Sequence, residues 1–169
     1  MRGAKRRLVA AVLAVTATAL LVSSVGAALG ESVRANGVVL ALPEGWQRVL
    51  PVRDDRTADP RTLLVIGTEG VRLIETDCQV SSYRVPPEGA AVVVIGWRDS
   101  VGGSGFLPLS GLKLRRGTFE CFAGRGAVAR VVRRERDFQV NVMVGDRADA
   151  ATIADAFEAA RSFAIVPRG

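Results

Sequence analysis

The chain has 169 residues, of which 49% are hydrophobic and 24% charged, and its formal net charge is +6. Four positive charges lie within residues 1–7 and every acidic residue follows residue 30. Residues 31–169 therefore carry a net charge of only +2, and nucleic-acid binding is not expected. The absence of histidine excludes catalytic triads that use imidazole, and two cysteines cannot complete a cysteine-only zinc site. We therefore predict no catalytic residue, no metal site and no cofactor.

The N-terminal segment, residues 1–30, has the composition of an export signal. A positively charged stretch precedes residues 8–30, which contain no charged residue. A signal peptide has this arrangement, and Ala28-Leu29-Gly30 supplies small residues ahead of a cleavage point. The same stretch is also long enough for one membrane span. Both interpretations place a single extracytoplasmic domain at residues 31–169. Contact with the membrane is then expected only through residues 8–30, if they are retained.

The next part of the chain is predicted to form short strands joined by turns, at residues 38–42, 63–66, 71–74 and 80–85. Pro43 and Gly45 predict a turn that folds Trp46 back into the core. Residues 53–61 are charged and predict a surface loop. Residues 90–97 contain consecutive valines and an isoleucine, which is typical of a central strand covered on both faces. Residues 102–117 are predicted to be a flexible loop.

The C-terminal part predicts a β-hairpin followed by a helix. Apolar and polar residues alternate on both sides of a charged break at 133–137, which indicates a hairpin over 126–145 with one buried face. Residues 147–161 have helical spacing, and a short strand at 162–166 closes the chain. The fold class is therefore α+β, with a mainly antiparallel sheet and the helix packed on one face. The helix has candidate N-caps and an apolar stripe, namely Asp146 or Asp149 as caps, and Ile153, Phe157, Ala150, Ala154 and Ala160 as the stripe.

The two cysteines, Cys78 and Cys121, are predicted to form a structural disulfide. In an exported domain an even pair of cysteines most often bonds in this way. The bond would close a loop of about forty residues and add about 2–4 kcal/mol of stability. A redox function would need a Cys-x-x-Cys motif or an activating base, and the sequence supplies neither.

Arginines cluster around the hairpin at Arg130, Arg133, Arg134 and Arg136 and could form a patch that binds an anion or a partner. The alternative is a solvated turn whose charges prevent edge-to-edge aggregation. The glycines at 102–105 lack the Gly-Lys-Ser/Thr ending of a phosphate loop. The carboxylate pair Asp54-Asp55 has no apolar setting that would separate the two pKa values.

The chain resembles small exported actinobacterial proteins of unknown function in five segments. These are Pro43-x-Gly-Trp46, Cys78, the Pro-Pro-x-Gly-Ala90 turn, Cys121 and residues 136–145 with the helix that follows. The order of elements is also similar to the C-terminal half of Mog1/PsbP-like α+β sandwiches, which some mycobacterial lipoproteins resemble. This chain lacks the lipidation cysteine of those lipoproteins. The resemblance implies a fold and an extracytoplasmic place, and it carries no catalytic motif.

Two function classes follow from these observations. The first is a non-catalytic exported or cell-envelope domain that binds a partner protein, an envelope component or a small apolar ligand. The alternative is a carboxylate-based cell-envelope hydrolase. A cleft with two converging carboxylates would favour the hydrolase, whereas a pocket without them would favour binding.

Overall fold

The computed structural model describes residues 31–49, 59–78, 80–98, 105–119 and 122–166. The expected export segment and the carboxylates Asp54 and Asp55 lie outside these residues, as do Cys121 and most of the glycine run at 102–105. The α+β class, with a mainly antiparallel sheet and a C-terminal helix on one face, is confirmed. No helix in the described part of the chain is long and apolar enough to cross a membrane.

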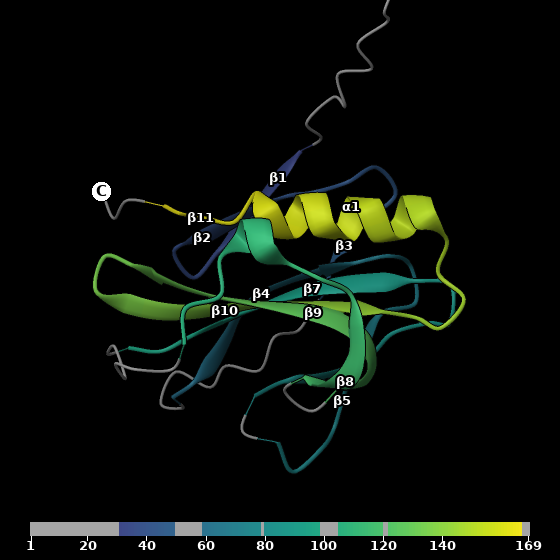
Figure 1. Ribbon diagram of the computed structural model, residues 1–169, viewed down its shortest axis with the longest axis horizontal. Coiled ribbons are helices and arrows are strands. Elements are labelled where there is room, and N and C mark those ends of the chain that lie inside the picture. The colour runs from purple at the N-terminus through teal and green to yellow at the C-terminus, as the bar shows by residue number, and fades with distance from the viewer. Residues whose placement is uncertain (1–30, 50–58, 79, 99–104, 120–121, 167–169) are drawn as a thin grey trace, which may run out of the picture.

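A six-stranded antiparallel sheet forms the centre of the fold (Figure 1). Its strands, in spatial order, are β3 (Gln47–Arg48), β4 (Arg61–Gly67), β7 (Ala90–Gly96), β10 (Arg136–Val144), β9 (Phe122–Arg133) and β8 (Arg115–Phe119). Every residue of β7 is buried, and the strand pairs with β4 on one side and β10 on the other. The prediction of a central strand covered on both faces is therefore confirmed.

The predicted hairpin consists of β9 and β10, joined by a two-residue turn. Arg133 pairs with Arg136, and the residues between them, Arg134 and Glu135, have φ angles of 50° and 60°. The hairpin is confirmed, but the expectation of one buried face is wrong for β10. Gln139 and Asn141 are as buried as the valines between which they alternate. Alternation in the sequence indicated solvent on that face, whereas a second layer covers it.

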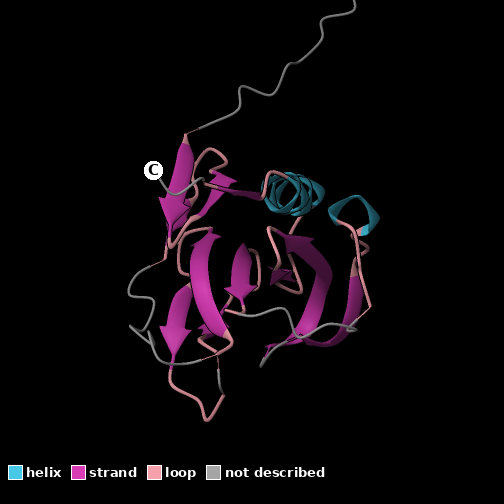
Figure 2. Cartoon of the chain, turned by 90° about the vertical axis from the view of Figure 1, so that its left-hand side faces the viewer, coloured by secondary structure: helices cyan, strands magenta, loops and turns pink. Residues whose placement is uncertain are grey.

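On the first face of the sheet lie the helix α1 (Ala150–Arg161) and a small sheet. That sheet has the strand order β1 (Ser32–Ala35), β2 (Val38–Ala41), β11 (Ala164–Ile165). Figure 2 shows the helix end-on above the strands, and its most extensive contacts are with β7, β10 and β2. Trp46 is buried in the hydrophobic cluster between this layer and the six-stranded sheet, as expected.

The buried stripe of α1 is rotated from the predicted one. Phe157 and Ala160 are buried as expected and Ile153 is half-buried, but Ala150 and Ala154 are exposed. Ala156 and Ala159 take their place. Successive helical residues are about 100° apart, so Ala154 and Ala156 lie on opposite flanks of Phe157. The sheet contacts only one flank, and the sequence alone could not say which.

The predicted loop over 102–117 is wrong at residues 115–117, which belong to a strand, whereas most of residues 105–114 lie in no strand or helix. Leu109–Gly111 form the 3-10 turn η1, and β8 begins at Arg115 and pairs with β9. The sequence Arg-Arg-Gly-Thr-Phe shows no apolar alternation, since an edge strand has little surface to bury. Pairing with β9, a tertiary contact, makes this segment a strand.

The second face of the sheet is partly covered by a hairpin of β5 (Arg72–Ile74) and β6 (Ser82–Arg84). Beneath it lies a second hydrophobic cluster that includes Val65, Val93, Ile95 and Met143. The described members of both clusters lie between Val33 and Ile165. A chain that begins at Glu31 therefore keeps every described element and core residue.

Asp149, one of the two predicted N-cap candidates, is the N-cap of the helix. Its Oδ1 accepts a hydrogen bond of 2.7 Å from the backbone N–H of Thr152. That bond, with a second from the side chain of Thr152, lowers the pKa of the Asp149 carboxyl below its usual value of 3.8. Because the folded-state pKa is the lower one, the charged cap stabilises the fold above pH 3.8. This stabilisation is lost as the pH falls through the folded-state pKa.

We expect Asp149→Ala to lower the melting temperature by a few degrees at neutral pH, because the Thr152 N–H loses its acceptor. The difference from the wild type should shrink as the pH falls below 3.8. Asp149→Asn is the control, since its amide oxygen still accepts the bond but does not titrate. Thermal melts at several pH values measure this. A wild-type to Asp149→Ala difference that stays constant down to the most acidic pH would contradict it.

Candidate functional site

Cys78 is the one predicted disulfide cysteine that lies within the described residues. Cys78 lies after β5, is half-buried and is disulfide-bonded, and no described cysteine is free. Its expected partner, Cys121, lies outside the described residues, so the Cys78–Cys121 pairing stays a prediction. The immediate environment of Cys78 is a turn in which its backbone N–H donates to Thr76 Oγ1 at 3.3 Å.

The four arginines of the predicted patch fall into two groups, and the first consists of Arg130 and Arg136, which pack onto the sheet. Arg130 Nε donates a 3.0 Å hydrogen bond to Gln139 Oε1. Arg136 Nε donates to the Trp97 carbonyl at 3.4 Å, and its guanidinium lies 5.2 Å from the Phe138 ring centroid. Both side chains are half-buried; Arg130 joins the two strands of the hairpin, and Arg136 joins the hairpin to the segment that follows β7.

The second group, Arg133 and Arg134, lies exposed at the closed end of the hairpin. Within the described part of the chain, Arg133 donates a hydrogen bond only to the carbonyl of its neighbour Val132. The structure therefore brings Arg133 and Arg134 together and separates them in environment from Arg130 and Arg136.

A polar row extends inward from Arg130 along the second face of the sheet. Gln139 accepts from Arg130 and donates through Nε2 to Asn141 Oδ1 at 3.1 Å. Asn141 is 0% exposed, and its Nδ2 has no hydrogen-bond partner among the residues that the structure describes. A buried donor without an acceptor costs about 1–3 kcal/mol of stability, so this polar row lowers the stability of the core. The sequence signalled it only as the polar half of an alternation.

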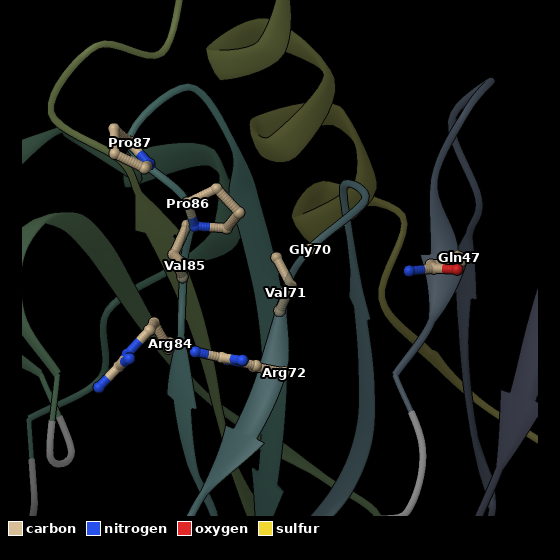
Figure 3. Close-up of a pocket in the computed structure, with 8 residues that line it drawn as sticks. All are labelled: Gln47, Gly70, Val71, Arg72, Arg84, Val85, Pro86 and Pro87. Carbon is tan, nitrogen blue, oxygen red and sulfur yellow. The ribbon is translucent and has the colours of Figure 1, made fainter.

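A groove of about 380 Å³ lies beside the β5–β6 hairpin (Figure 3). It is lined by eight residues: Gln47, Gly70, Val71, Arg72, Arg84, Val85, Pro86 and Pro87. Figure 3 shows the Arg72 side chain extending toward Arg84, with Gln47 across the groove and the two prolines at one end. The wall is thus part cationic and part aliphatic, and its lining contains no carboxylate.

Backbone hydrogen bonds hold one wall of the groove to the end of β10. The Gly145 N–H donates to the Gly89 carbonyl at 2.9 Å, and the Arg147 N–H donates to the Pro87 carbonyl at 2.7 Å. The Gly89 N–H closes the turn on the Pro86 carbonyl at 3.0 Å. Proline also restricts backbone rotation, so this wall is formed before any ligand arrives.

Arg72 and Arg84 are directly opposite each other in the antiparallel pair β5–β6. Like charges at such positions repel and weaken strand pairing. Both side chains are exposed, and neither forms an ion pair with any residue that the structure describes. The acid nearest in sequence to the prolines, Glu88, pairs with Arg147 instead. The two guanidinium groups therefore remain available to an anion.

Sequence reasoning did not single out Arg72 and Arg84. Twelve positions separate them, and only the register of β5 on β6 makes them neighbours. The available signal was an arginine in each of two short apolar segments, which indicates nothing until those segments pair. Among the described residues, no group of histidine, cysteine or acidic side chains could hold a metal ion.

Comparison with known proteins adds no assignment. No protein-family model matches the chain, and no curated protein is detectably similar to it.

Proposed function

We propose that residues 31–169 form a non-catalytic extracytoplasmic domain, with a Mog1/PsbP-like sandwich arrangement, that binds an anionic component of the cell envelope in the groove beside β5 and β6. The observation that carries this proposal is the unpaired cross-strand couple of Arg72 and Arg84. The repulsion between the two arginines destabilises the β5–β6 pair, and an anion that binds both guanidinium groups removes that repulsion. The extracytoplasmic place is supported by the composition of residues 1–30.

The chemistry of the wall specifies the ligand class. Two guanidinium groups suit a carboxylate or a phosphoryl group, because each planar guanidinium can donate two parallel hydrogen bonds to two oxygens of such an anion. Val71, Val85 and Pro86 supply aliphatic surface beside them, so an anion attached to a small apolar body fits better than a bare ion. A carboxylate-based hydrolase would need acidic groups at the reacting centre. A cationic lining favours holding an anion.

The test is calorimetric titration of residues 31–169 with phenyl phosphate, inorganic phosphate and phenol. We expect phenyl phosphate to bind most tightly, inorganic phosphate more weakly and phenol not measurably. Arg72→Ser and Arg84→Ser should each weaken phenyl phosphate binding about tenfold, since each removes a charge-assisted contact. Arg34→Ser, which removes an exposed arginine from β1, is the matched control and should bind as the wild type does.

Stability distinguishes a binding defect from a folding defect. Each groove variant should melt at or slightly above the wild-type temperature, because a repulsion worth about 0.2–1 kcal/mol is relieved. Absence of binding by the wild type would exclude the proposal, as would equal weakening by Arg34→Ser. Turnover of phenyl phosphate would instead favour a hydrolase.

A further inference from the structure

The closed end of the β9–β10 hairpin lies beside a second segment, residues 105–107. Leu107 and Arg130 exchange backbone hydrogen bonds, 3.0 Å from the Leu107 N–H and 2.8 Å from the Arg130 N–H. This bridge places the segment along β9, two residues before Val132. Figure 1 shows the hairpin end extending to the left, beyond the helix. We name the hairpin-end surface by its residues, Phe106, Leu107, Val132, Arg133 and Arg134.

The hairpin-end surface is unusually apolar for an exposed region. Phe106 is 62% exposed, Leu107 43% and Val132 49%. Within the described residues only one other large hydrophobic side chain is exposed, Leu114, which immediately precedes β8. Leu107 pairs with Arg130, and Val132 follows two residues along β9, so Leu107 and Val132 lie on one face. Phe106 is the residue before Leu107, so three exposed apolar residues lie along the bridge between this segment and β9, as is typical of a docking surface.

The same region is basic. Residues 130–137 contain four arginines and two acidic residues, a net charge of +2. Residues 105–119 contain three basic residues and no acidic one. The turn places Arg134 in the left-handed region at φ 50°, where asparagine or glycine would be less strained. A long cationic side chain thus occupies the outermost position of the hairpin, beside Glu135.

We propose that the hairpin-end surface docks on an anionic phospholipid bilayer. Phe106 and Leu107 enter the headgroup region with Val132 beside them, while Arg133 and Arg134 donate to lipid phosphates. Exposed aromatic and aliphatic side chains at a projecting end, surrounded by cations, complement the apolar interior and negative surface of such a bilayer. An acidic protein surface would attract the arginines but would offer less to an exposed phenylalanine. This contact is separate from the one expected of residues 8–30, and it does not depend on the groove.

The test uses residues 31–169, which keep every described element and lack the apolar segment that could bind bilayers by itself. The protein is sedimented with vesicles of phosphatidylcholine alone or of an equimolar mixture with phosphatidylglycerol. We expect binding to the mixed vesicles to be at least about tenfold tighter and to weaken as salt is added.

Variants that remove positive or negative charge from the hairpin-end surface should change vesicle binding in opposite directions. Arg133→Ser with Arg134→Ser should weaken binding by about fivefold per arginine, whereas Glu135→Gln should strengthen it by about fivefold. Phe106→Ser should weaken it about tenfold, and Phe106→Trp should retain it, since tryptophan favours the interface. The matched control is Arg34→Ser with Arg48→Ser, which removes the same charge from exposed positions on β1 and β3 and should bind as the wild type does.

Each remaining outcome contradicts the proposal. Absence of vesicle binding would exclude a bilayer as the partner of this surface, and equal binding to both vesicle types would exclude recognition of anionic lipid. A double variant at Arg133 and Arg134 that binds as tightly as the double variant at Arg34 and Arg48 would show that the hairpin end makes no contact. Loss of vesicle binding in a variant with Arg72→Ser and Arg84→Ser, while the double variant at Arg133 and Arg134 still binds, would assign the membrane contact to the groove.

Discussion

Gly145→Ala is expected to lower the free energy of unfolding by about 3 kcal/mol, the upper end of the usual cost of overpacking. A Cβ at this position would lie 2.1 Å from the Pro86 carbonyl oxygen and 2.3 Å from that of Pro87. Both obstacles are backbone atoms, so a rotamer change cannot remove them. The Pro86–Pro87 segment would have to move away from β10, and the hydrogen bond from the Gly145 N–H to Gly89 would weaken.

Because Pro86 and Pro87 line the groove, the same variant should also weaken binding of phenyl phosphate. Chemical denaturation and calorimetric titration measure the two effects on one sample. Gly105→Ala is the control, because nothing lies within 4 Å of its added Cβ. That variant should unfold within about 0.5 kcal/mol of the wild type. A Gly145→Ala protein with wild-type stability would show that the proline segment is free to move.

Phe138→Ala should cost about 3–5 kcal/mol of stability, as deletions of buried aromatic side chains do. Phe138 is 1% exposed, its ring lies 5.3 Å from that of Phe163, and the Arg136 guanidinium covers it. The truncation therefore leaves a cavity between β10 and the layer that holds the closing strand. It also removes the ring on which Arg136 stacks.

Urea unfolding measures this cost, with Phe106→Ala as the matched control. The control deletes the same atoms from a side chain that is 62% exposed, and its stability should change by no more than about 0.5 kcal/mol. Similar losses in both variants would mean that Phe138 is not in the core. A large loss in Phe106→Ala alone would place the hairpin-end surface inside the fold.

Where the local pattern of apolar residues agrees with the burial in the structure, the sequence was sufficient to predict the element. Residues 90–96 carry a continuous apolar run rich in β-branched residues, which suits a strand with both faces covered, and β7 is that strand. The hairpin follows from alternation around a charged break. The cap at Asp149 follows from an acceptor placed before a helical period, and its hydrogen bond to Thr152 is local. Each of these elements depends on residues within a few positions of one another.

Burial of the second sheet face could not be predicted, because alternation reports the polarity of a side chain and not what covers it. Gln139 and Asn141 read as solvent-facing, yet a second layer buries them. The strand β8 likewise has no pattern of its own and exists through pairing with β9. In both cases the deciding partner is distant in the sequence or belongs to another layer.

The sequence by itself determined the α+β class, the central strand, the hairpin, the helix and its cap, because period and capping are local properties. Only the tertiary structure decided which residues form a candidate site. The register of β5 on β6 makes Arg72 and Arg84 neighbours, and the end of β10 holds the proline wall through Gly145. The bridge from Leu107 to Arg130 places exposed apolar residues beside the hairpin arginines. These contacts depend on strand register and layer packing, which are set by the whole chain and leave no periodic signal in any one segment.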